Sequence, residues 1–102
     1  MYGLIAKLTM VPGKREEMIA ILKESAASMS GCFSYVVAQD SADENTIWVT
    51  EVWDTEASHD ASLSLPSVRM AIPKGKAIVA SFEKVAVTTP VWGAGLPAGH
   101  TH

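Results

Sequence analysis

Apolar and polar residues alternate over residues 2–11, which is the pattern of a strand with one buried face. The apolar positions of that face are Tyr2, Leu4, Ala6, Leu8 and Met10. Pro12 and Gly13 then break the alternation. From residue 14 the apolar spacing changes to three and four, which predicts an amphipathic helix with Gly31 as its C-terminal cap. The apolar positions of this helix are Met18, Ile19, Leu22, Ala26 and Met29.

The middle of the chain predicts an antiparallel hairpin. Residues 32–40 and 46–54 are rich in β-branched and aromatic side chains, and a short polar segment connects them. Residues 55–80 are predicted to be helical but interrupted, with Thr55 as an N-cap and Pro66 starting a second segment. Residues 81–89 alternate again and predict a fourth strand.

The resulting order, β α β β α β, predicts a ferredoxin-like α+β fold: a four-stranded antiparallel sheet with helices on one face. A chain of 102 residues with 48% apolar residues fits a single globular domain of this kind. We expect the domain to occupy residues 1–90. Residues 91–102 are rich in Gly and Pro and are expected to form an irregular tail.

The predicted strands carry bulky apolar groups on both faces. In the third strand, Val49 and Trp53 share a face with Glu51, whereas Trp48 and Val52 lie on the other face. Helices cover only one side of such a sheet, and an apolar second face is rarely left in water. We therefore expect a homodimer packed sheet to sheet, with the tail as a candidate to reach the partner.

Charge and composition narrow the range of partners. The net charge of −3 and the lack of a basic cluster argue against binding to nucleic acid. No apolar run approaches the roughly 18–20 residues of a membrane span, and the first ten residues, MYGLIAKLTM, lack the features of a secretory signal. We expect a cytoplasmic protein without a nucleic-acid or membrane partner.

Neither the cysteine nor the histidines predict a metal site or a bound cofactor. Cys32 is the only cysteine, so it forms no internal disulfide, and a buried structural thiol is the expected role. The histidines are His59 and two in the tail, His100 and His102, without zinc-type spacing or an HExxH motif.

Several short motifs, in this order and spacing, resemble the antibiotic biosynthesis monooxygenase domain family, and especially its quinol monooxygenase type. They are PG at residues 12–13, GC at 31–32, EVWD at 51–54 and HDASLSLPSVRMAI at 59–72. The resemblance implies a dimeric α+β barrel with a pocket between sheet and helices in each protomer. It also implies oxidation of a phenolic compound by molecular oxygen without a cofactor, although other members degrade haem or isomerise a small sugar phosphate.

Only some of the family's site residues are present at the matching positions of this chain. Trp53 matches a tryptophan that lines the pocket in the oxygenase members, but Val49 stands where the aromatic-polyketide oxygenases carry an asparagine. Haem degradation is disfavoured, because Ala6 replaces the asparagine of the haem-degrading members and the axial histidine is missing. Ser62 and Ser67 stand where many quinol-type members have histidines.

His59 is the candidate catalytic base of the folded region, because histidine is the side chain that changes charge near neutral pH. A phenol that has lost its proton is a better electron donor to oxygen. The alternative is a surface histidine beside Asp60. Glu51 shares its face with Trp53; if that face lies toward the helices, burial would raise the pKa of Glu51 and allow proton transfer. If it lies toward the dimer partner, Glu51 would pair with a cation such as Lys7.

Substrate contacts are expected from the two helical regions and the third strand. Arg69 could orient a phenolic or anionic group or form a surface ion pair, and the methionines could line a pocket or simply fill the core. The predicted substrate-binding residues are Met18, Leu22, Val49, Ser62, Arg69 and Met70. Two kinds of function stay open: a cofactor-independent monooxygenase acting through His59, Trp53 and Glu51, or a non-catalytic dimeric module that binds a small aromatic ligand. An isomerase with the same base is a third.

Overall fold

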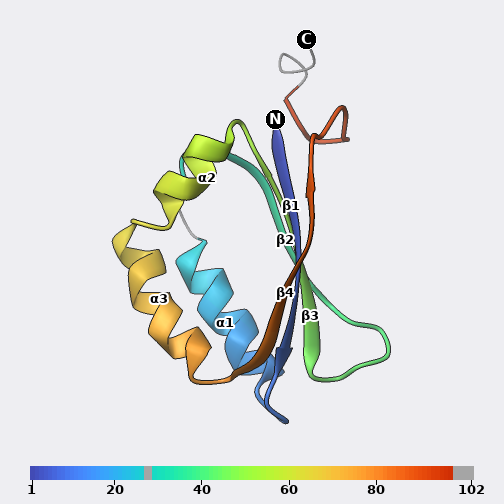
Figure 1. Cartoon of the computed structure of the whole chain (residues 1–102), viewed down its shortest axis with the longest axis vertical. Helices are drawn as coiled ribbons and strands as arrows, with labels where there is room; N and C mark the ends of the chain where they lie inside the picture. Colours follow the sequence, from blue (N-terminus) through green and yellow to red (C-terminus); the bar gives the residue numbers. More distant parts are fainter. Residues whose placement is uncertain (27–28, 98–102) are drawn as a thin grey trace.

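The computed structural model describes residues 1–26 and 29–97. Figure 1 shows a layer of helices on one side of a twisted sheet. In chain order the elements are β1 (Tyr2–Met10), α1 (Arg15–Ser25), β2 (Cys32–Gln39), β3 (Thr46–Trp53), α2 (Glu56–Ser62), α3 (Pro66–Lys76) and β4 (Val79–Thr88). All four predicted strands are confirmed to within two residues.

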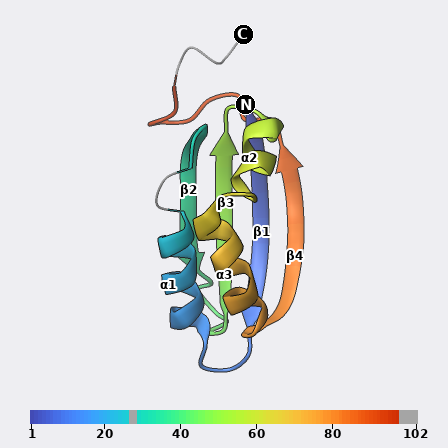
Figure 2. The same ribbon diagram turned by 90° about the vertical axis from the view of Figure 1, so that its left-hand side faces the viewer.

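The sheet has the order β2-β3-β1-β4, and every neighbouring pair is antiparallel. This is the strand order of a ferredoxin-like fold, so the predicted fold class is confirmed. Helices α1 and α3 lie over β2, β3 and β1, whereas β4 extends past them at the edge of the sheet (Figure 2). Apolar side chains on the helix side of β4 are consequently exposed, including Phe82 at 60% and Val87 at 55%.

The core lies between the helices and the three covered strands. Its centre is a cluster of fully or nearly buried residues: Met10, Met18, Ile47, Val49 and Ile78. Trp53 is also fully buried, at the other end of β3. The face of the sheet predicted to carry Val49, Glu51 and Trp53 is therefore the face that packs against the helices.

The opposite face of the sheet has no helix over it in Figure 1. Trp48 lies on this face, and its indole N–H donates to Asp40 Oδ1 at 2.8 Å. The ammonium of Lys7 lies 5.5 Å from the Trp48 ring centroid, a cation–π distance. Asp40 accepts this bond and two backbone N–H bonds, which lower its pKa to about 2.

Helix α1 is shorter than predicted, because it ends at Ser25 with Ala26 as its C-cap. The Ser25 hydroxyl donates to the Leu22 carbonyl at 3.0 Å, a local bond that competes with helix propagation. Gly31 is therefore not the cap. It has a φ of 84° immediately before β2, and an added Cβ would lie 2.8 Å from Ser58. Both facts favour glycine there.

The interrupted helical region is confirmed, including both predicted start signals. Thr55 caps α2, since its hydroxyl accepts the Ser58 N–H at 3.1 Å. Pro66 lies in the first turn of α3, where its missing N–H costs nothing. No helix of the described residues is long and apolar enough to cross a membrane.

Replacement of the central core residue should test this packing. Ile47→Ala removes a fully buried side chain, and we expect the free energy of unfolding to fall by about 2–5 kcal/mol. Val87→Ala, at an exposed position of β4, is the control and should change it by less than about 0.5 kcal/mol. Urea denaturation monitored by tryptophan fluorescence would measure both. Equal losses in the two variants would contradict the placement of the core.

Candidate active site in a cavity between sheet and helices

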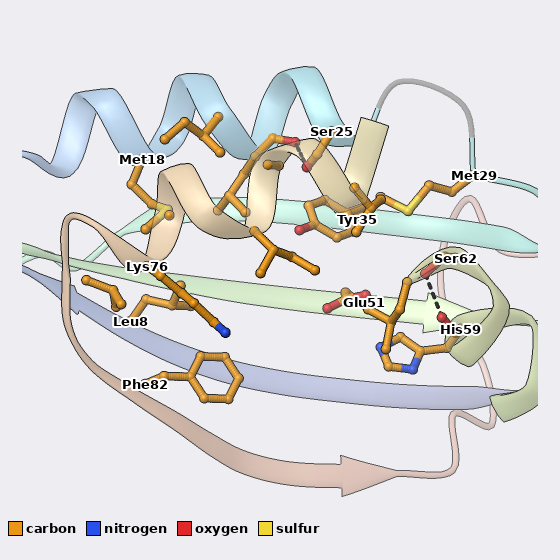
Figure 3. A pocket seen from close by; sticks show the side chains of 18 residues that line it. Leu8, Met18, Ser25, Met29, Tyr35, Glu51, His59, Ser62, Lys76 and Phe82 are labelled. Atoms are coloured by element: carbon orange, nitrogen blue, oxygen red, sulfur yellow. Dashed lines mark hydrogen bonds between the residues drawn. The ribbon is translucent and has the colours of Figure 1, made fainter. Parts of the chain in front are cut away.

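A cavity of about 500 Å³ lies between the sheet and the helices. Its walls are mostly aliphatic and aromatic, and they come from β1, β2, β3, β4 and all three helices. Tyr35, Glu51 and His59 gather toward one end, which we call the polar end (Figure 3). Lys76 and Phe82 lie toward the other end. This size and composition are typical of sites for small organic ligands.

Glu51 is the carboxyl group of the polar end. In the sheet it lies between Leu4 on β1 and Tyr35 on β2, so its side chain points to the helix side. Burial raises the pKa of Glu51, against the opposing effects of a hydrogen bond from Trp53 and the nearby His59. Of the two orientations considered for Glu51, the structure shows the one toward the helices. Lys7 lies on the other face of the sheet, over Trp48, and is not its partner.

Trp53 supports the polar end from behind. Its indole Nε1–H donates to Glu51 Oε1 at 2.9 Å, and its ring meets the His59 ring edge to face with centroids 5.5 Å apart. Trp53 is not among the residues that line the cavity. Its place is therefore a fixed wall behind Glu51 and His59, which lets it orient both groups.

His59 lies in the last turn of α2 and lines the cavity with only 14% of its side chain exposed. Its ring is held between Trp53 and Tyr2, whose ring centroid is 5.5 Å away. His59 Nδ1 lies 3.2 Å from Asp60 Oδ1. A carboxylate at this position favours the tautomer with the proton on Nδ1, which leaves Nε2 as an acceptor. His59 therefore lies beside Asp60, as the surface alternative expected, and its ring also lines the cavity.

Three of the six predicted substrate-binding residues line the cavity: Met18, Leu22 and Ser62. The Ser62 hydroxyl donates to the His59 carbonyl at 2.6 Å, a bond within the last turn of α2. The other three do not line the cavity. Val49 is buried in the core, Met70 is 66% exposed on the outside of α3, and Arg69 is likewise exposed.

Tyr35, Lys76 and Phe82 line the cavity and were not predicted. Tyr35 could have been found from the hairpin register, which places it opposite Glu51. Burial and the charge of Glu51 raise the pKa of the Tyr35 hydroxyl, so it stays protonated and can donate a hydrogen bond. Lys76 and Phe82 lie on either side of the start of β4, and the sequence pattern that predicts this strand does not show that the two side chains turn into the same cavity.

Cys32 lies on the helix side near the polar end, paired with Trp53 across the sheet. Burial and the charge of Glu51 raise the pKa of its thiol, which makes it a poor nucleophile. Among the described residues, no three His, Cys, Asp or Glu side chains are placed to hold a metal ion. The tail histidines His100 and His102 lie outside the described residues.

Fold and cavity together define a ferredoxin-like α+β domain with an internal, mostly apolar site. The sequence profile of the antibiotic biosynthesis monooxygenase family matches residues 1–74, and the chain belongs to this family. A family protein of Chloroflexus aurantiacus J-10-fl is 54% identical over 94% of this chain and 98% of its own, with a TM-score of 0.90.

More distant solved structures share the fold. A family protein from Deinococcus radiodurans is 22% identical, with a TM-score of 0.76 over 91% of this chain and 95% of its own. One from Nitrosomonas europaea is 14% identical, with a TM-score of 0.81 over 90% of this chain and all of its own. A comparison with curated proteins found no significant match.

The raised pKa of Glu51 predicts a pH-dependent contribution to stability. At low pH the carboxyl is protonated in both the folded and the unfolded chain. As pH rises through the raised folded pKa, the unfolded chain loses the proton more readily, so folding becomes less favourable. Glu51→Gln should remove this effect and be more stable relative to wild type at pH 7 than at pH 4.

The control is Glu24→Gln, an exposed position on α1. Chemical denaturation of all three proteins across this pH range measures the difference in free energy of unfolding. A Glu51→Gln profile parallel to that of wild type would show that Glu51 has an ordinary environment.

Proposed function

We propose that this protein is a cofactor-independent monooxygenase that oxidises a hydroquinone or related phenolic compound with molecular oxygen. The observation that carries the proposal is the cavity itself, with apolar walls and with Tyr35, Glu51 and His59 converging at one end. Such a site would hold an aromatic ring in the apolar part and place its hydroxyl at the polar end. Membership of the antibiotic biosynthesis monooxygenase family supports the same reaction class.

Proton removal is the step assigned to His59. Its Nε2, free of hydrogen bonds within the described part of the chain, would accept the phenolic proton. Glu51 would stabilise the resulting imidazolium, since the charges of the two side chains interact favourably. Trp53 holds the carboxyl group of Glu51 by its hydrogen bond, and Tyr35 can donate to a substrate oxygen.

The phenolate is the electron donor to oxygen, so the protein need supply only binding and proton transfer. A phenol with a free para position and O₂ give a para-quinone and water: one oxygen atom joins the ring carbon, and the other leaves with the ring and hydroxyl hydrogens. A hydroquinone with a free ring position and O₂ give a hydroxyquinone and water in the same way. If the hydroquinone only gives up two hydrogens, O₂ is reduced to hydrogen peroxide, which is an oxidase reaction and not a monooxygenase reaction. The apolar walls favour entry of the apolar O₂ molecule.

We also propose a cytoplasmic homodimer that covers the outer sheet face, which is the face opposite the helices. On this face Val36 is 50% exposed, and Trp48 and Val52 are only half-buried. A second copy of the same face would bury them. Trp92 and Val91 of the tail, exposed at 80% and 75%, would pack on the partner.

Oxygen uptake should depend on His59. With a panel of hydroquinones and anthrones, corrected for autoxidation, we expect His59→Ala to lower turnover by about 100-fold, while Glu56→Ala on the exposed side of α2 leaves it unchanged. Trp53→Phe should lower turnover by less, because Glu51 loses its hydrogen bond but the ring remains. An oxygen electrode and product analysis give the rates.

Full turnover in His59→Ala would rule out its role as the base. Ligand binding without oxygen uptake would favour the non-catalytic binding module, and a rearranged product formed without oxygen would favour an isomerase.

The proposed dimer should be broken by a charge on the outer sheet face. Val36→Glu is expected to give a monomer in light scattering coupled to size-exclusion chromatography, because two carboxylates would face each other across the interface. Met70→Glu, at an apolar position exposed on α3, is the matched control and should keep the mass of wild type. A monomeric wild type, or a dimer in Val36→Glu, would contradict this interface.

A further inference from the structure

We propose that Lys76 binds an anionic group of the substrate at the end of the cavity opposite Glu51 and His59. The substrate class would then be an elongated aromatic compound with an acidic group, such as a carboxylate, remote from the ring that is oxidised. This inference deepens the proposed function and rests on it. It transfers to Lys76 the role that the sequence suggested for Arg69, which does not line the cavity.

Lys76 is held in place by the junction between α3 and β4. It is the last residue of α3, and the N–H of Ile78, two residues on, donates back to the Gly75 carbonyl at 3.1 Å. Ile78 is buried, and its carbonyl accepts the Val11 N–H at 2.9 Å. The backbone at Lys76 is therefore fixed to the end of β1, and the side chain starts from a defined position.

The side chain of Lys76 runs along the cavity wall. Figure 3 shows its stem near Leu8 and Phe82, with the ammonium directed into the cavity. Lys76 is the one lysine or arginine among the cavity-lining residues in the described part of the chain, and it forms no ion pair there. Lys76 is an exposed residue, but its ammonium has no counter-charge in an ion pair and is a favourable partner for an anion.

The sheet register sets the distance between the two ends of the cavity. Phe82, next to the Lys76 ammonium, pairs with Leu8 of β1, whereas Glu51 pairs with Leu4. Four residues of an extended strand span about 13 Å. A ligand that contacts both Phe82 and Glu51 therefore extends along the cavity, as two or three fused rings do. The intervening wall is apolar and includes Met18 and Leu22.

A simpler role for Lys76 is that its aliphatic stem covers Leu8 and Phe82 while the ammonium stays in water. The two roles differ in what they require of the ligand. Shielding by the stem affects any aromatic ligand equally, whereas binding through the ammonium discriminates by ligand charge.

The test is binding of two matched three-ring probes, anthraquinone-2-carboxylate and the neutral 2-(hydroxymethyl)anthraquinone, measured by titration calorimetry. Wild type should bind the carboxylate more tightly. Lys76→Met should weaken the carboxylate about fivefold, the loss typical of a partly exposed ion pair, and leave the neutral probe within about twofold. Lys76→Arg should keep the preference. Lys74→Met, on the same helix but outside the cavity, is the control and should behave as wild type.

The proposal is overturned if Lys76→Met weakens both probes equally or neither, if wild type shows no preference for the carboxylate, or if wild type binds neither probe. Because no turnover is involved, the result is independent of the oxygen-uptake experiment. Charge-selective binding without oxygen uptake would refute the monooxygenase and keep the anion site.

Discussion

The arrangement of this site depends on one partly buried hydrogen bond, from Trp53 Nε1 to Glu51 Oε1 at 2.9 Å. A carboxyl group among apolar side chains is costly unless it has a partner. The two residues are two apart on β3, so strand geometry alone brings them to the same face and within reach of each other. Because Trp53 is fully buried, it cannot move away. Glu51 is thereby fixed, and His59 packs against the same indole ring.

The cavity itself follows from incomplete coverage of the sheet. Two main helices lie over three strands, and β4 extends beyond them (Figure 2). The cavity lies between these helices and the sheet, and most of the side chains that surround it are apolar. The fold therefore creates a pocket with mostly apolar walls, and the few polar side chains in the pocket determine its chemistry.

Much of the fold could be predicted because it rests on local periodicity. Alternation identified the strands, and Thr55 and Pro66 marked the helix starts through their own backbone chemistry. The predicted end of α1 was wrong. The helix ends at Ser25, although apolar residues continue at helical spacing beyond it. Because side chains two apart on a strand share a face, the sequence placed Glu51 and Trp53 together. Only the packed structure shows that this face lies under the helices.

The rest of the site depends on how the helices are rotated against the sheet, which the sequence does not encode locally. Which side of α3 faces the sheet is set by packing of its residues against α1, so Arg69 and Met70 could not be excluded from the pocket beforehand. Lys76 and Phe82 come together only through the turn that joins α3 to β4.

The central claim is that the polar end removes a proton from a bound phenol. The most direct measurement is the absorption spectrum of 4-nitrophenol, a phenol whose pKa lies close to that of histidine, bound to the protein at pH 6, where the free phenol is mostly neutral. The account predicts the nitrophenolate band with wild type and its loss with His59→Ala. A bound nitrophenol that stays neutral in wild type would contradict it.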